Sequence, residues 1–564
     1  MTNPAVPLRS RVGAYLAGLV PRASDYALTR RTWRADLLAG LTVGIVALPL
    51  ALGFGVSSGL TAEAGLVTAI VAGLLAAVFG GSNVQVSGPT GAMVVILVPI
   101  VATQGAAAVA TVSVVAGIVV VAAGALHLGR AVSFIPWPVI EGFTLGIAVI
   151  IFLQQVPLLL SPRTAHAGDH SPNAVVAAGQ SLTGADWSYV PWALGAAAIV
   201  AACMVVAPRI HRSLPGSLIG IVVVTLLAFL LPTPLAVIGV LPASLPAPVL
   251  PALDPASLGA LLLPALTVAA LAAIESLLSA RVAASLADTG AYDPDRELVG
   301  QGIASIGSGL FGGMPATGAI ARTAVNVRSG GRSRLSAIVH AVVLLLVVLI
   351  AAGPVGAIPL AALAGVLMVT AVRMVHAGTV RAILRSTRAD ALGFVLTAIV
   401  TVSFDLIIAV LIGVVVAGVF ALRNLSRATG VHREPIPADP EPGDDGIAII
   451  RFDGPLFFAA ADRVFDTVTA LGDDVTVVIL RMSQLELVDA TGARILSDIV
   501  QALERRGVTV LIKGVQAGHE ELFRTVGVLD SLRHHNHLFA ELPPAIEHAR
   551  SHIRRSDTTS RTTP

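Results

Sequence analysis

Long apolar stretches separated by short polar ones make up a little over two thirds of the chain, from residue 37 to residue 423. Each stretch has roughly 15–22 residues, the length that an α-helix needs to cross the hydrocarbon core of a bilayer. We therefore predict membrane-spanning helices at 37–57, 62–80, 106–126, 138–160, 189–207, 217–231, 257–279, 298–312, 335–352, 357–375, 389–404 and 406–422.

Two further apolar stretches, near 84–103 and 315–328, are shorter and are interrupted by glycine and proline. They contain Val84-Gln-Val-Ser-Gly-Pro-Thr-Gly-Ala92 and Gly313-Met-Pro-Ala-Thr-Gly-Ala-Ile-Ala-Arg322. With these two stretches the chain has about 14 crossings, which form two sets of seven. Each interrupted stretch is the third crossing of its set. Such a pair predicts a transporter site between two inverted repeats. We expect each to be a short extended stretch leading into a half-helix, whose N-terminus favours an anion.

Arginines are distributed unevenly among the predicted loops. If the N-terminus is cytoplasmic, every even-numbered crossing ends inside, and most loop arginines lie at those ends, with Arg163 the exception. This bias agrees with the positive-inside rule. We therefore expect a multi-pass protein of the cell membrane with both termini in the cytoplasm. The arginines on the inner side are Arg130, Arg209, Arg212, Arg281, Arg328, Arg332, Arg334, Arg373, Arg381, Arg385 and Arg388.

Composition supports this fold class, a polytopic α-helical membrane protein. The chain is 55% hydrophobic and 12% charged, about half the charge of an average soluble protein. Its net charge of +2 gives no reason to expect a nucleic-acid partner. One cysteine, Cys203, lies in an apolar run and excludes a disulfide within the chain. Residues 1–36 are polar or mixed, do not resemble a signal peptide, and are expected to form a cytoplasmic leader.

A soluble domain is predicted after the transmembrane part, which spans 37–423. A linker rich in proline and acidic residues is expected at 424–446, and a disordered tail at 555–564. Between them, 447–554 alternates strand and helix patterns, which predicts a small α/β domain. The strands are expected at 447–452, 475–480 and 508–512, and the helices at 459–471, 492–506, 516–527 and 543–553.

Two charges mark a candidate site inside the membrane domain. Glu275 lies in the apolar run 261–278, and Arg322 follows the glycine-rich run 307–318. A charge at membrane depth costs roughly 3 kcal/mol on insertion scales, and broken backbone is tolerated there only inside protein or beside a watery cavity. We therefore predict a polar site in the middle of the membrane domain. The structural alternatives are a helix-end acid in headgroup water and an arginine that extends to the cytoplasmic surface.

Several residue types at this site suit an anion. Arginine binds planar oxyanions through two N–H groups, hydroxyl groups add donors, and glycine allows close approach of the backbone. The histidines at 127, 340 and 376 lack metal-ligand spacing and are expected at the membrane interface. Glu141 is also expected there, and the alternative is that it forms a second titrating site. The predicted hydroxyl and glycine contributors are Ser87, Thr90 and Thr317, and Gly88 and Gly318.

No pattern in the sequence indicates catalysis. The chain has no recognisable nucleophile–base pair, no P-loop and no dinucleotide-binding loop. We therefore expect a protein that is not an enzyme, has no cofactor, and holds no metal beyond a Na⁺ at Glu275.

Motifs in both halves and in the soluble domain resemble the SulP sulfate permease family of anion transporters, over about residues 35–550. The resemblance implies seven-plus-seven inverted repeats, core and gate domains, elevator-like movement and a homodimer. It also implies an anion site that includes Phe54, Gly88, Ala321 and Arg322, and a coupling role for Glu275 with Na⁺ or H⁺. The motifs are Asp36-Leu-Leu-Ala-Gly-Leu-Thr-Val-Gly-Ile-Val-Ala-Leu-Pro49, Gly88-Pro-Thr-Gly91, Ile274-Glu-Ser-Leu-Leu278, Glu297-Leu-Val-Gly-Gln-Gly302, Phe311-Gly-Gly-Met-Pro-Ala-Thr-Gly-Ala-Ile-Ala-Arg-Thr-Ala-Val-Asn326 and Val488-Asp-Ala-Thr-Gly492.

Some segments are similar to the family's bicarbonate-transporting members, among them Gly55-Val-Ser-Ser-Gly59 and Gly330-Gly-Arg-Ser-Arg-Leu335. Leu50 stands where many sulfate-type members have glutamine, which removes a hydrogen-bonding group. Sulfate remains the family's default substrate, with bicarbonate coupled to Na⁺ as the nearest alternative. A dicarboxylate symporter coupled to H⁺, a passive anion channel and a sensor that transports little are further alternatives.

The soluble domain resembles the family's STAS domain through Val488–Gly492. Thr491 holds the place that is phosphorylated in soluble relatives, and it precedes a predicted helix, where a phosphate is favoured. The simpler interpretation, which we favour, is that Asp489 and Thr491 cap that helix.

Overall fold

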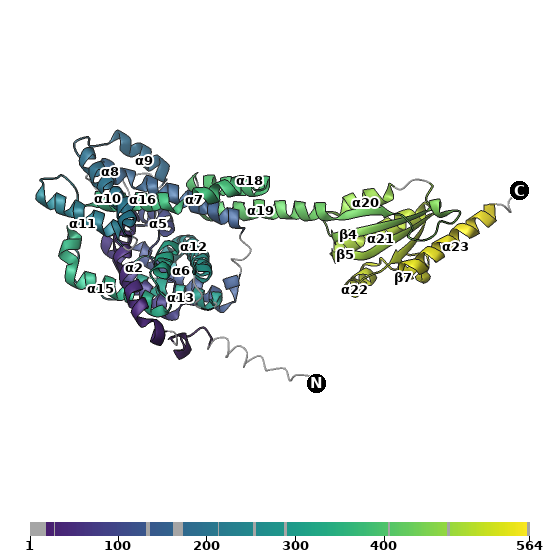
Figure 1. Ribbon diagram of the computed structural model, residues 1–564, viewed down its shortest axis with the longest axis horizontal. Coiled ribbons are helices and arrows are strands. Elements are labelled where there is room, and N and C mark those ends of the chain that lie inside the picture. The colour runs from purple at the N-terminus through teal and green to yellow at the C-terminus, as the bar shows by residue number, and fades with distance from the viewer. Residues whose placement is uncertain are drawn as a thin grey trace. The chain divides into compact units, whose positions relative to one another are not determined.

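The computed structural model describes residues 18–26, 29–130, 136–161, 173–211, 214–251, 255–286, 290, 292–403, 406–470 and 474–560 (Figure 1). The chain divides into two compact units, Met1–Val414 and Val415–Pro564. The first unit is helical and the second is built on a β-sheet. Each unit is described by itself below.

The first half of the helical unit follows the predicted order of spans. Helix α2 contains Pro49, and the second span is one continuous helix with a short π-helical turn, η2, in its middle. The third span is the broken one, made of the two-residue strand β1 and helix α5. The elements are η1 (Ala23–Tyr26), α2 (Thr29–Ser57), α3 (Ala62–Val67), η2 (Thr68–Ala72), α4 (Gly73–Phe79), β1 (Ser87–Gly88), α5 (Gly91–Gln104), α6 (Ala108–Ala125), α7 (Trp137–Gln154), α8 (Val156–Leu160), α9 (Ala174–Thr183), α10 (Val190–Ile210) and α11 (Gly216–Leu230).

The second half repeats this order. Its third span is again broken, into strand β2 and the nine-residue helix α14. The elements are α12 (Pro255–Leu286), α13 (Pro294–Leu310), β2 (Thr317–Gly318), α14 (Ile320–Arg328), α15 (Arg334–Gly356), α16 (Leu360–Met374), α17 (Ala377–Leu384), α18 (Arg388–Ser403) and α19 (Leu406–Ala428).

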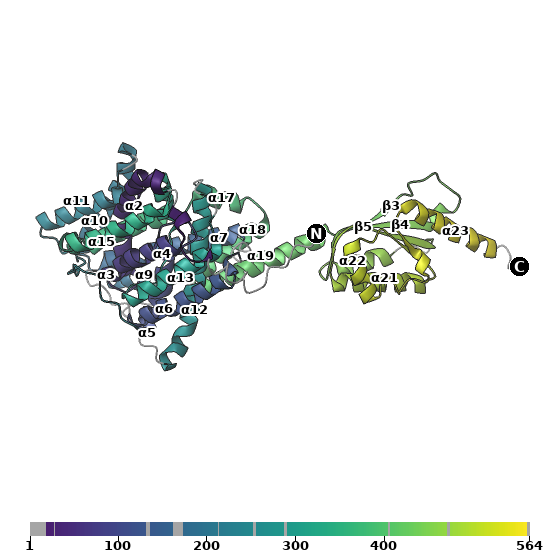
Figure 2. The same ribbon diagram turned by 90° about the horizontal axis from the view of Figure 1, so that it is seen from below.

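Helix packing in this unit is reciprocal between the halves. Helix α6 of the first half packs against α12 and α13, and its counterpart α15 packs against α2 and α4. In the same way α7 packs against α18 while α16 packs against α10. Both views show α6, α12 and α13 close together (Figures 1 and 2). This exchange of partners is what two interlocked repeats require.

Only 4% of the residues are aromatic, so the helices pack through small residues that allow close approach. A Cβ added to Gly117 of α6 would lie 2.6 Å from the carbonyl oxygen of Gly302 in α13. The same holds where α2 crosses α15, because a Cβ on Gly40 would lie 2.5 Å from the carbonyl oxygen of Ser336. Gly40 is therefore a packing residue.

Within the described residues, eight helical segments are long and apolar enough to cross a membrane. Three apolar helices are shorter, among them α5 and α11. The remaining predicted crossings, such as α13 and α14, carry more polar residues because they line the interior of the unit. The structure agrees with the predicted polytopic helical fold.

Three details of the helical unit differ from the sequence-based expectation. Helix α2 begins at Thr29, inside the segment expected to be a leader, while residues 1–17 lie outside the described part of the chain. Helix α9 was not predicted because it is short and amphipathic, and α17 was not predicted for the same reason. Both lie between spans and add no crossing to the predicted order.

The second unit is a five-stranded sheet of order β3-β4-β5-β6-β7, parallel except for β3. Alternate residues of its strands point to opposite faces. Ile450 of β4 packs toward α20, α21 and α22, whereas Ile449 packs toward α23. Figure 2 shows α21 and α22 on one side of the sheet and α23 on the other. The elements are β3 (Gly430–Glu434), η4 (Asp444–Gly446), β4 (Ile447–Leu456), α20 (Ala461–Thr469), β5 (Val477–Val488), α21 (Ala490–Arg505), β6 (Thr509–Lys513), α22 (Ala517–Val526), η5 (His535–His537), β7 (Leu538–Phe539) and α23 (Leu542–Ser560).

Two boundaries of this unit need correction. Strand β3 lies inside 424–446, which the sequence analysis assigned to a linker, and it pairs antiparallel with β4. Helix α23 continues to Ser560, into the expected disordered tail, and residues 561–564 lie outside the described part. The strand was not predicted because the surrounding segment is rich in proline and acidic residues. In addition, it is a short edge strand whose own side chains are mostly polar.

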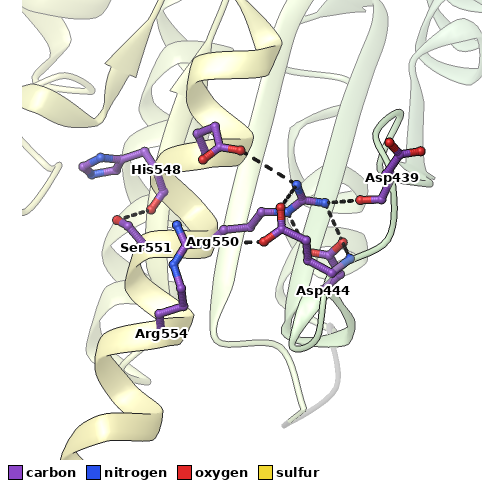
Figure 3. Close-up of polar contacts among 8 residues, drawn as sticks. Asp439, Asp444, His548, Arg550, Ser551 and Arg554 are labelled. Carbon is purple, nitrogen blue, oxygen red and sulfur yellow. Dashed lines mark hydrogen bonds and ion pairs between the residues drawn. The ribbon is translucent and has the colours of Figure 1, made fainter.

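Arg550 of α23 explains why much of the expected linker is ordered. Its guanidinium donates to Asp444 at 2.8 Å and 2.9 Å, to Glu441 at 2.6 Å, and to the backbone oxygen of Asp439 at 2.7 Å (Figure 3). The Arg550 side chain is 7% exposed. These interactions of the buried Arg550 side chain hold the segment before β4 against the C-terminal helix.

Candidate functional site

The two broken segments meet in space although they lie in different halves of the chain. Strand β1 pairs antiparallel with β2, with Ser87 opposite Gly318 and Gly88 opposite Thr317. Beyond the strands, the N–H of Ala319 donates to the carbonyl oxygen of Val86 at 2.9 Å. The pairing satisfies backbone groups that would otherwise be unpaired inside the membrane domain.

Each strand leads directly into a half-helix, as the sequence predicted. Helix α5 begins after its N-cap Thr90, and α14 begins after its N-cap Ala319. Neither cap residue bonds the first turn of its helix with its side chain. The first N–H groups of both helices, and the positive ends of their dipoles, therefore flank the paired strands and favour a negative charge there.

Glu275 of α12 lies beside the strand pair. Its Oε2 accepts hydrogen bonds from the hydroxyls of Thr90, at 2.9 Å, and Thr317, at 2.8 Å. The two threonine hydroxyls are themselves 3.0 Å apart. One carboxylate oxygen thus joins both broken segments, and it is surrounded by oxygen atoms that suit a hard cation or a proton.

Arg322 lies in the first turn of α14 and is 2% exposed. Its Nη2 donates to the carbonyl oxygen of Pro89 at 2.5 Å, whereas its buried Nη1 has no hydrogen-bond partner. A Cβ on Gly88, which has φ +151°, would lie 2.7 Å from Nη1. A side chain at this position would displace the guanidinium, so glycine is required where the arginine approaches the backbone.

Other predicted site residues surround this centre. Phe54 is buried in α2, and a Cβ on Gly91 at the start of α5 would lie 3.3 Å from its ring. Ala321 is exposed in the first turn of α14. The N–H of Gly318 donates to the hydroxyl of Ser276 at 3.1 Å, and sequence reasoning gave Ser276 no role.

Ser87 belongs to a different polar cluster. Its hydroxyl accepts a hydrogen bond from Gln301 at 2.5 Å, and Gln301 also donates to Glu297 at 2.9 Å. The other oxygen of Glu297 accepts from the backbone of Gly81 and Ser82 at 2.8 Å and 3.0 Å. Glu297 and Gln301 lie in a quoted family motif, yet the sequence analysis gave neither a role. They hold the β1 segment in place from α13.

The four interface predictions have different outcomes, and His376, the N-cap of α17, is exposed. His340 is fully buried in α15, and a Cβ on Gly73 would lie 3.7 Å from its ring, so it is not an interface residue. His127 lies beside Asp295, with Nδ1 and Oδ2 3.1 Å apart. Glu141, in the first turn of α7, accepts a hydrogen bond from the Trp137 indole at 3.1 Å in an exposed position, as expected of an interface pair.

In the sheet unit, the predicted cap is confirmed for one residue. Asp489 is the N-cap of α21 and accepts from the N–H of Gly492 at 2.7 Å. Thr491 lies in the first turn with an exposed side chain. Phosphorylation of Thr491 stays a prediction.

Comparison with known proteins agrees with this arrangement. Residues 33–401 match the model of the sulfate permease family, which covers more than half of the chain. The chain belongs to the sulfate permease family. Residues 441–543 match the STAS domain, so the sheet unit is the family's STAS domain.

Curated relatives of this chain are named transporters rather than enzymes. The putative sulfate transporter YvdB of Bacillus subtilis is 35% identical over 509 residues, covering 89% of this chain and 95% of YvdB. The bicarbonate transporter BicA of Picosynechococcus sp. is 33% identical over 475 residues, covering 78% of this chain and 82% of BicA. The permease is therefore a member of a family of membrane anion transporters and not an enzyme.

Solved structures show the same fold. The transmembrane domain of a cyanobacterial BicA, 33% identical, covers 69% of this chain and 97% of its own with a TM-score of 0.59. SLC26A9, 17% identical, covers 98% of this chain and 96% of its own with a TM-score of 0.80. At this low identity the second likeness speaks for the fold alone.

Proposed function

We propose that the permease is a secondary active transporter of small inorganic oxyanions, working by elevator-type alternating access. The observation that carries this proposal is the Nη1 of Arg322, a buried donor without a partner. It lies beside Gly88, where the N-termini of α5 and α14 flank the strand pair. An anion bound there would accept hydrogen bonds from the guanidinium and from free backbone N–H groups. Sulfate is the substrate class that the family match supports.

Coupling would pass through Glu275. A carboxylate at this depth is costly unless it is paired, protonated or bound to a cation. Its Oε2 already has two hydroxyl partners, and both come from the segments that would hold the anion. A Na⁺ or a proton at Glu275 would therefore neutralise the charge that repels the substrate. Anion and cation would then bind cooperatively, by the same factor in each direction.

Bicarbonate carried together with Na⁺ is the second candidate. It is supported by the 33% identity to the BicA relatives and by the cluster of oxygen atoms around Glu275. Leu50, which is buried in α2 and apolar, offers no hydrogen bond to the second negative charge of sulfate.

Location and assembly follow from the same proposal. The arginine bias supports insertion in the cell membrane with both termini in the cytoplasm. A homodimer is proposed on family resemblance. Crosslinking of the purified protein in lipid nanodiscs tests it, and a monomer at all protein concentrations would contradict it.

Uptake by proteoliposomes tests the proposed function. Vesicles containing the purified protein receive labelled sulfate, bicarbonate or fumarate, with Na⁺ and pH gradients imposed in turn. We expect uphill accumulation of one inorganic oxyanion that depends on one of the two gradients. Fumarate accumulation driven by protons would indicate a dicarboxylate symporter. Anion currents without accumulation would indicate a passive channel, and either result would contradict the proposal.

A further inference from the structure

Three histidines of the STAS domain gather at one place, outside the transport site. His537 ends the short helix η5, and His548 and His552 lie one turn apart on α23. Their ring centroids form a triangle with sides of 5.4 Å, 5.5 Å and 4.9 Å. One ring nitrogen from each residue lies within 4.8 Å of the other two. Three imidazole rings from two elements thus face a common point.

Local structure positions each ring. Strand β7 follows η5 directly and pairs with β6, which holds His537 at the sheet edge. Positions four apart on a helix share a face, so His548 and His552 project together from α23. Their Nε2 atoms are 3.3 Å apart. That is close to the separation of about 3.4 Å between two nitrogen ligands of a tetrahedral zinc ion with Zn–N bonds of about 2.1 Å.

His537 supplies the observation that points to a ligand. The residue is 1% exposed, and its Nδ1 is buried without a hydrogen-bond partner. A buried acceptor or donor left unpaired costs stability.

We propose that His537, His548 and His552 form a binding site for a divalent transition-metal ion, with zinc the best match. Three imidazole nitrogens around an open fourth position are a recognised zinc ligand set, and imidazole also suits cobalt and nickel. The half-buried rings of His548 and His552 leave a path from solvent. A bound ion would fasten α23 to the sheet edge.

The site is separate from the hydrogen bonds and ion pairs of Arg550 on the same helix. Figure 3 shows the His548 ring pointing away from the Arg550 guanidinium. Metal binding and the Arg550 ion pairs therefore hold α23 from different sides. The pattern His548-x-x-x-His552 is a sequence signal for such a site, but the third ligand lies in another element and becomes apparent only in the fold.

The test uses full-length protein purified without a polyhistidine tag, treated with a chelator and then titrated with Co²⁺, whose absorption reports ligand number and geometry. We expect one Co²⁺ per chain, displaced by one Zn²⁺. His548→Asn and His552→Asn should each weaken binding by at least about tenfold. His519→Asn, which changes a histidine of α22 outside the triangle, is the matched control and should bind as the unchanged protein does.

Thermal unfolding separates a ligand role from a structural one. Zn²⁺ should raise the melting temperature of the unchanged protein and of His519→Asn, and should leave that of His548→Asn unchanged. In chelator alone, all three proteins should melt at similar temperatures, because the substituted side chain is partly exposed. Binding that the His548 and His552 substitutions do not weaken, or binding of less than one ion per chain, would overturn the proposal and indicate adventitious metal only.

Discussion

Arg322 is the residue whose surroundings most clearly call for an anion. One of its terminal nitrogens is used by Pro89 and the other is buried without a partner. We expect Arg322→Ala to weaken anion binding by about 10- to 100-fold, the usual effect of losing hydrogen bonds to a charged group. Equilibrium binding of labelled anion to the purified protein measures this.

Arg328 provides the control for that substitution, since it lies on the same helix and is exposed. Arg328→Ala should bind anion normally, and both variants should be expressed at equal levels. Unchanged binding by Arg322→Ala would place Arg322 outside the site.

Glu275 tests the coupling. Glu275→Gln keeps the shape of the side chain but removes the charge that a cation or proton must neutralise. We expect this variant to bind anion and to exchange anion for anion, but to lose uphill accumulation driven by Na⁺ or pH. Glu141→Gln should keep normal accumulation, because Glu141 lies in an exposed pair with Trp137. If Glu275→Gln still concentrates substrate with normal gradient dependence, the coupling role is wrong and Glu141 becomes the next candidate.

Among the elements, the spans and the broken segments could be predicted because apolar length and glycine–proline interruptions are local signals. The meeting of Gly88 with Thr317 was anticipated only through the repeat argument. The polar cluster of Glu297 and Gln301 was missed, because no local pattern says that two residues of one helix turn toward a strand from the other half. Strand β3 was missed because its pairing with β4, rather than its own composition, makes it a strand.

The contact between Arg550 of α23 and Asp444 of η4 predicts how the stability of the STAS domain depends on pH. Hydrogen bonding from Arg550 holds the pKa of Asp444 below its ordinary value. A carboxyl whose folded pKa is lowered stabilises the fold above its unfolded pKa of about 3.9. That stabilisation is lost as the pH falls through the still lower folded pKa.

Asp444→Asn should therefore lower the melting temperature of the STAS transition by roughly 2–5 °C at pH 7. The difference from the unchanged protein should shrink as the pH falls below about 4. Scanning calorimetry of the full-length protein from pH 7 to pH 3 measures both. A difference that stays constant over this range would show that the ion pair is not its cause.

At the scale of the whole molecule, the two units have separate cores. A chain that stops after Ala428 retains every proposed crossing and loses the entire sheet. We expect it to insert and to bind anion, with a reduced transport rate or impaired assembly. Binding measured on the purified truncated protein checks this, and complete loss of binding by a well-folded sample would contradict a site confined to the helical unit.

The pairing of β1 with β2 also sets the order in which the protein can mature. Thr90 and Thr317 are 227 positions apart along the chain, so the first broken segment is synthesised long before its partner exists. Until then its backbone groups have no protein partner in the bilayer, where an unpaired group is costly. The transport site is thus among the last parts to form during biosynthesis. Two separately encoded halves, divided between α11 and α12, should each insert but transport only when co-expressed, and uptake by cells that make one or both halves will show it.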